Sequence, residues 1–119
     1  MTQEKDSRFG VVPYEGPVYQ AARIQPDDAV LGLDVHVTAR GANRSTGFHV
    51  FLRIDPAQIA PPELDFVNRP PTGIVAPVIV PFSVNTTLKY PLNVEFVTIH
   101  DARGTHRVPI DRILATNAA

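Results

Sequence analysis

The sequence contains no cysteine. Disulfide bonds, thiolate metal ligands and a thiol nucleophile are therefore excluded. The sequence also has no apolar run long enough to span a bilayer. The polar N-terminal stretch MTQEKDSRFG lacks the apolar segment of a signal peptide. We therefore expect a soluble, cytoplasmic protein that has no membrane partner.

An excess of charge of one sign is also missing. Acids and bases are interspersed, and the formal net charge is -1. The basic face typical of nucleic-acid-binding proteins is absent, so we expect no nucleic-acid partner. The chain is 44% hydrophobic and has 119 residues. These values are typical of one globular domain that can bury a core without covalent cross-links.

The twelve prolines leave little room for helices. A proline inside a helix costs about 3 kcal/mol. The longest proline-free windows, Asp27 to Asp55 and Leu92 to Val108, both have the pattern of strands. The sequence therefore predicts an all-β protein with proline-rich connections and little helix.

The clearest strand pattern lies between Val30 and Asp55, where apolar and polar residues alternate. The apolar positions are Leu31, Leu33, Val35, Val37 and Ala39, and then Phe48, Val50, Leu52 and Ile54. Such alternation places one set of side chains on each face of a strand. The intervening GANRSTG has the glycines and small polar residues of a loop. We therefore predict a β-hairpin made of these two strands.

The register of this hairpin follows from its charges. Pairing Val35 with Leu52 superimposes the two apolar faces and places Asp34 opposite Arg53. Opposite charges across a strand pair contribute roughly 0.2–1 kcal/mol. We therefore prefer this register, which also sets His36 opposite Phe51.

Further strands are predicted from weaker patterns. They cover 18–24, a short piece around Leu64 and Phe66, 73–84, 88–100 and 105–110. Pro77 and Pro81 lack N–H groups on the same side of the strand at 73–84, which therefore suits a sheet edge. A turn at 101–104 would set His100 opposite His106.

Six or seven strands at this spacing favour an antiparallel β-sandwich. The pattern resembles that of immunoglobulin-like sandwiches, although the Cys–Trp–Cys signature is absent. We expect a flexible N-terminal arm at 1–16, one β-sandwich domain at 17–114 and a frayed tail at 115–119.

No catalytic constellation is visible in the sequence. Ser7, Ser45 and Ser83 all lie outside any G-x-S-x-G motif. The loop GANRSTG leads into a strand, whereas a phosphate-binding loop leads into a helix. We therefore expect a protein that is not an enzyme and has no cofactor.

The four histidines are weak candidates for a metal site. A zinc or copper ion needs three or four ligands that converge at about 2 Å. His36 and His49 on the first hairpin, together with His100 and His106 on the last, supply these only if both pairs meet at one end of the sandwich. The alternative is that all four are surface histidines on strands.

Phe51 is the best candidate for contact with a partner. It shares the polar face of the first hairpin with His49 and His36, and Arg44 lies in the adjoining loop. An aromatic residue among polar neighbours is either covered by another sheet or available to a partner. We therefore predict an accessory, adaptor or structural subunit that binds another protein or itself. The alternative is a sandwich that binds a small ligand or a metal through its histidines.

Overall fold

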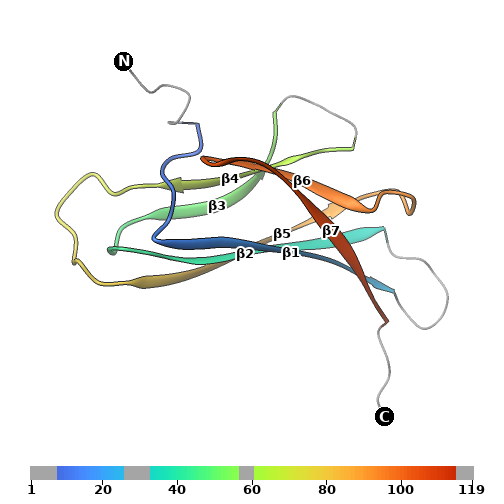
Figure 1. Cartoon of the computed structure of the whole chain (residues 1–119), viewed down its shortest axis with the longest axis horizontal. Coiled ribbons are helices and arrows are strands. Elements are labelled where there is room, and N and C mark those ends of the chain that lie inside the picture. The colour runs from blue at the N-terminus through green and yellow to red at the C-terminus, as the bar shows by residue number, and fades with distance from the viewer. Residues whose placement is uncertain (1–7, 26–32, 57–60, 115–119) are drawn as a thin grey trace, which may run out of the picture.

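The computed structural model describes residues 8–25, 33–56 and 61–114, which form strands and no helix (Figure 1). The strands are β1 (Glu15–Gln25), β2 (Asp34–Asn43), β3 (His49–Ile54), β4 (Leu64–Arg69), β5 (Val80–Lys89), β6 (Phe96–Asp101) and β7 (Gly104–Leu114). The all-β prediction is therefore confirmed. The predicted tail at 115–119 and the first seven residues of the predicted arm lie outside the described ranges.

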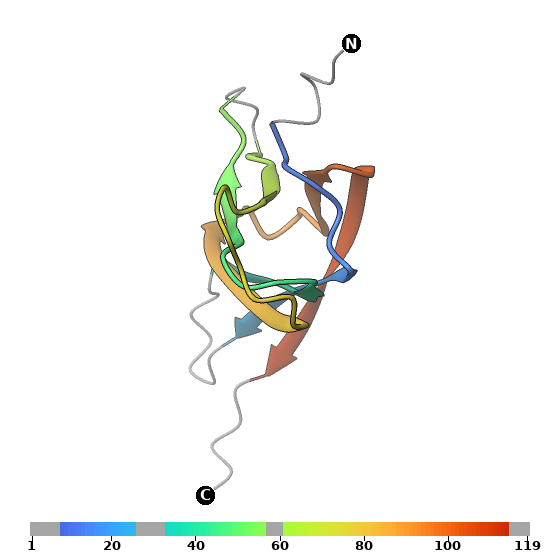
Figure 2. The same ribbon diagram turned by 90° about the vertical axis from the view of Figure 1, so that its left-hand side faces the viewer.

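The seven strands form one sheet in the order β3-β4-β6-β7-β1-β2-β5. Strand β7 joins the two halves, because its first part pairs antiparallel with β6 and its second part pairs parallel with β1. The sheet curls round until β5 comes back beside β3, which gives a nearly closed barrel (Figure 2). This shape differs from the predicted immunoglobulin-like sandwich. The β1–β7 and β4–β6 pairings are also parallel, whereas only antiparallel pairs were predicted.

The inner face of the barrel holds the hydrophobic core. Val35, Val37 and Ala39 of β2 are fully buried there, as their alternation predicts. Other strands and their connections add Ala21, Leu64, Phe66, Leu88, Tyr90, Val97, Ile99 and Val108. None of the described segments is a helix with the length and apolar character required to cross a bilayer.

The predicted hairpin between β2 and β3 is wrong. Strand β2 lies between β1 and β5, whereas β3 pairs with β4. Asp34 is opposite Lys89, with Nζ and Oδ1 2.7 Å apart. Arg53 is opposite Asp65, with Nε and Oδ2 3.1 Å apart. Both charges thus find an opposite charge across a strand pair, but on strands that are distant in the sequence.

The loop between β2 and β3 explains why they separate. The Thr46 N–H donates to the carbonyl of Ala76 at 3.1 Å, and the Ala76 N–H donates to Thr46 Oγ1 at 3.1 Å. The loop therefore bonds to the connection between β4 and β5 instead of closing a tight turn. Strand β2 in turn pairs along ten residues with β5, whereas β3 offers only six.

The last hairpin differs from its predicted register by one residue. Asp101 pairs with Gly104 and His100 with Thr105, so His106 lies opposite Ile99. Neighbouring residues of a strand point to opposite faces. His100 is therefore on the outer face and His106 on the inner one, and the predicted His100–His106 pair is wrong.

Strand β5 is the last strand of the described sheet, as predicted for the strand that carries Pro81, whereas Pro77 lies in the connection before it. The ladder with β2 covers Val80–Lys89 and includes Pro81. Residues 73–79, which the sequence assigns to the same strand, instead belong to the connection from β4.

Part of the N-terminal segment also joins the sheet. Gly10 forms a parallel bridge with Asn68 of β4. The Val11 N–H donates to the Asn68 carbonyl, and the Asn68 N–H donates to the Phe9 carbonyl, both at 2.9 Å. This segment therefore continues the edge of β4 beyond its two-residue ladder with β6.

Candidate functional site

A row of polar side chains crosses the outer face of β3, β4 and β6. Arg53 is in register with Asp65, and Asp65 is in register with His100. Residues in register on neighbouring strands share a face. Leu64 and Ile99, the neighbours of this row along β4 and β6, belong to the core, so the row points away from it.

Arg8 covers this row and neutralises its acids. Its Nη2 lies 3.2 Å from Asp65 Oδ2 and 3.1 Å from Asp55 Oδ2. Partial burial lowers the pKa of Arg8. Hydrogen bonds to Asp65 and Asp55, and the negative charges of these two side chains, outweigh the effect of burial, so the pKa of Arg8 is raised. Arg53 Nη2 also donates to the carbonyl of Arg8 at 3.3 Å. Asp65 is therefore fully buried between two guanidinium groups.

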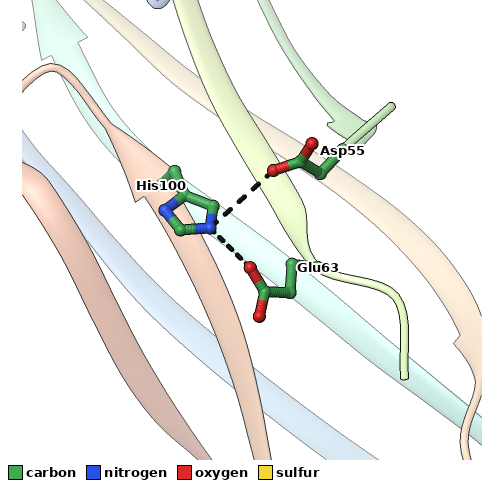
Figure 3. Close-up of side chains that lie close together, drawn as sticks. All are labelled: Asp55, Glu63 and His100. Carbon is green, nitrogen blue, oxygen red and sulfur yellow. Dashed lines mark hydrogen bonds and ion pairs between the residues drawn. The ribbon is translucent and has the colours of Figure 1, made fainter. Parts of the chain in front are cut away.

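His100 meets two carboxylates at the end of this row (Figure 3). Its Nε2 lies 2.6 Å from Glu63 Oε1 and 3.8 Å from Asp55 Oδ2. Its Nδ1 lies 2.9 Å from Thr105 Oγ1, which orients the ring. The Asp55 N–H donates to the Glu63 carbonyl at 2.7 Å and so holds the two acids together across the connection from β3 to β4.

The arrangement of Asp55, Glu63 and His100 can hold either a proton or a cation. One nitrogen and two carboxylate oxygens, all within 4.8 Å of one another, are a donor set that zinc and similar ions accept. Without an ion, a proton on His100 Nε2 is donated to Glu63. The sequence points to His100 but misses both acids, because alternation suggests that Glu63 faces solvent and nothing local links Asp55 to it.

His106 belongs to a separate cluster on the inner face. Its Nε2 lies 3.0 Å from Asp101 Oδ1, and its ring centroid lies 5.5 Å from that of Tyr19. The Tyr19 hydroxyl donates to Asp101 Oδ2 at 2.5 Å. Burial, and then the bond to Asp101, raises the pKa of Tyr19. This cluster does not reach His100.

His36 and His49 also lie apart from each other. His36 is in register with Thr87 of β5, and its Nδ1 lies 3.1 Å from Thr87 Oγ1. The predicted position of His36 opposite Phe51 is therefore wrong. His49 contacts Phe51, with ring centroids 4.9 Å apart. The four histidines do not converge in the part of the chain that the structure describes, so the condition for a metal site made from both pairs is not met there.

A second feature is the seam, the gap between the outer edges of β3 and β5. The Cα atoms of the two strands come within 8 Å of each other, but no ladder joins them in the ranges described. A groove of about 390 Å³ opens at the seam. It is lined by Asn43, Ser45, Gly47, Phe48, His49, Val50, Val80, Pro81, Phe82, Ser83 and Val84.

The groove opens at the loop end, which is the end of the barrel formed by residues 44–48 and 70–79 (Figure 1). Ile74 is fully exposed there, and Val78 and Ile79 are each 51% exposed. A neighbouring hollow of about 380 Å³ is lined by Arg44 and by Val11 to Tyr14, among others. The Arg44 guanidinium lies 4.3 Å from the Tyr14 ring centre.

The predicted partner-binding residues are thus only partly brought together. His49 lines the seam groove, and Arg44 lines the neighbouring hollow. Phe51 is half-buried beside His49, with the Arg69 guanidinium 6.0 Å from its ring centre. His36 lies on β2 in register with Thr87 of β5, whereas Phe51 lies on β3 in register with Val67 of β4.

No family model, no curated protein and no solved structure matches this chain.

Proposed function

We propose that this protein is a non-catalytic module that binds another protein through its loop end. The observation that carries the proposal is the exposure of Ile74, Val78 and Ile79 on one connection. Exposed apolar side chains that gather on one short connection are typical of an interaction site. Accessory, adaptor and assembly roles all suit such a module.

The connection that carries these side chains is held in place. The paired bonds between Thr46 and Ala76 fix its middle against the loop before β3. Gly47 also packs closely here, because a Cβ added to it would lie 2.9 Å from Pro71 Cβ. A surface that is already ordered loses less conformational entropy when a partner binds.

The apolar residues alone do not make a stable complex. Complete burial of a valine or isoleucine contributes about 1.5–3 kcal/mol. Association itself costs about 4–15 kcal/mol. Three such residues offset only part of that cost, so a partner needs further contacts, and the lining of the seam groove begins at Val80, directly after Ile79.

Affinity purification of the full chain from its source cells tests the proposal. We expect the recovery of a specific partner to fall about tenfold in an Ile74→Ser/Ile79→Ser variant, a loss of about 1.4 kcal/mol. Ile113→Ser is the matched control, because Ile113 is 45% exposed on β7, where it is in register with Ile24 of β1. Equal recovery with both variants would overturn the proposal. If the partner is a second copy of the chain, light scattering should show a molar mass that rises over a concentration series.

A second candidate function is the binding of a divalent cation by Asp55, Glu63 and His100. Their convergence favours it, and Thr105 fixes the His100 ring as an outer-shell residue of a metal site does. The charge of Arg8, 3.1 Å from Asp55, opposes a cation. Titration calorimetry with zinc should show one site that His100→Gln removes and His49→Gln retains. Equal heats from both variants would exclude this function.

A further inference from the structure

We propose that the seam groove takes an extended acidic segment of a partner protein, which adds as a strand to the free edge of β5. This inference rests on the proposed function and names the chemistry of the partner. The main-chain groups of β5 supply the affinity in this mode of binding, and the groove selects alternate side chains.

One edge of β5 has no hydrogen-bonded neighbour among the described strands. Strand β5 pairs with β2 along its whole length, and its other edge faces β3 across the seam. Insertion between two strands requires them to be about 10 Å apart, twice the usual spacing. The Cα atoms of β3 and β5 come within 8 Å of each other, so β3 has to move away from β5 for the segment to pair along Val80 to Val84, where the groove lies.

Pro81 indicates which main-chain groups face the seam. Proline has no N–H, and a strand tolerates it where its nitrogen faces away from the neighbouring strand. Since N–H groups alternate in direction along a strand, those of Ser83 and Asn85 point to the same side as the Pro81 nitrogen. We therefore assign the Ser83 and Asn85 main-chain groups as the docking points, with Pro81 at the limit of the ladder.

The charges around the groove favour an acidic segment. Arg40 is exposed beside Ser83, its register partner, and Arg69 is in register with His49 at the groove wall. Arg44 lies in the neighbouring hollow. The acids of the outer face, Asp55, Glu63 and Asp65, belong instead to the other ends of β3 and β4.

The apolar part of the groove selects the alternate residues of the segment. Phe48, Val50, Phe82 and Val84 line it, and each is half-buried, so each retains apolar surface that a partner can cover. Successive side chains of a strand point to opposite faces. The expected segment therefore alternates aspartate or glutamate with valine, isoleucine or leucine.

Selection from a library of short random peptides displayed on phage, with the full chain as bait, tests the inference. We expect the selected peptides to show this acidic and apolar alternation. Their affinity should fall about tenfold for an Arg40→Ser/Arg44→Ser variant. Arg107→Ser is the control. Arg107 belongs to β7 and lies over the ring of Phe96 on β6, away from the groove.

Two further measurements establish the strand ladder. Two versions of a selected peptide are compared, one N-methylated at its odd-numbered amides and the other at its even-numbered amides. One version should lose binding and the other should keep it, because only one of the two sets of amides faces β5. The amide resonances of Ser83 and Asn85 should shift on binding. Three results would overturn the inference. They are the selection of basic peptides, equal binding of the two methylated versions, and shifts of amide resonances confined to strands other than β5.

Failure of this inference is distinguishable from failure of the proposed function. If the Ile74→Ser/Ile79→Ser variant loses its cellular partner and no displayed peptide is selected, the loop end binds a partner but the seam takes no strand. If neither experiment gives a result above its control, both proposals fail.

Discussion

At the scale of single residues, Tyr90 couples stability to alkaline pH. Its side chain is buried in the core, and its hydroxyl donates to the Pro62 carbonyl. Burial, and then the charge of Glu63, raises the pKa of Tyr90 to about 12. The ordinary pKa of tyrosine is about 10, so the stabilisation is complete below about pH 10 and is lost as the pH rises towards 12.

We therefore expect the free energy of unfolding to fall between about pH 10 and 12. Tyr90→Phe should cost about 1 kcal/mol near neutral pH, through the lost hydrogen bond. The difference between this variant and the wild type should then shrink above pH 10. Urea unfolding at a series of pH values measures this, with Tyr14→Phe as the exposed control. A constant difference up to pH 12 would contradict the assignment.

Gly10 is a second residue whose identity the fold requires. Its φ is +79°, and a Cβ at this position would lie 1.9 Å from the Asn68 carbonyl oxygen. The left-handed conformation costs other residues about 1–2 kcal/mol, and the contact with a backbone atom adds to that. We expect Gly10→Ala to destabilise the protein by about 2 kcal/mol or to release the segment from β4. Gly73→Ala, which meets no atom within 4 Å, is the control for the same urea measurement.

At the scale of strands, the sequence predicts faces better than partners. The alternation that buries Val35 and Val37 is local, and the structure confirms it. The choice of partner depends on residues far along the chain. The charge of Asp34 suits Arg53 and Lys89 equally, and only the ten-residue ladder with β5 decides for Lys89. Proximity in the sequence therefore favours the wrong hairpin.

The ion pairs of Asp65 on β4 make a testable contribution to the stability of the protein. This carboxylate is fully buried and lies within 3.2 Å of both Arg8 and Arg53. Removal of one partner from a buried ion pair costs about 3–5 kcal/mol, and the partial exposure of both arginines reduces this. We expect Asp65→Asn to destabilise the protein by about 2–3 kcal/mol in urea unfolding. Asp34→Asn, in the exposed pair with Lys89, should stay close to wild type, and equal losses would contradict this ranking.

At the scale of the whole molecule, the candidate site shows the limit of sequence reasoning. His100 is recognisable as a possible ligand from its residue type alone. Arg8, Asp55 and Glu63 come from the N-terminal segment and from the two ends of a proline-rich connection, and only the curled sheet brings them to β6. Asp65 has the sequence pattern of a solvent-facing residue, yet Arg8 covers it.

Closure of the barrel gives the last prediction, because the proposed strand addition requires that β3 and β5 leave their facing edges unpaired. Strands β1 and β2 each have a paired neighbour on both sides, so Ala21 and Val37 lie in the interior of the sheet. Strands β3 and β5 each pair on one side only within the parts described.

We expect the amides that face the seam to exchange with deuterium at low opening free energies. The opening free energies of the amides in β1 and β2 should approach the global free energy of unfolding. Hydrogen exchange followed by NMR measures each amide, and the Ser83 and Asn85 amides should become protected when a selected peptide is added. Equally slow exchange on the seam side of β3 and β5 in the free protein would mean that the two strands pair in solution, which would leave no edge for a partner strand.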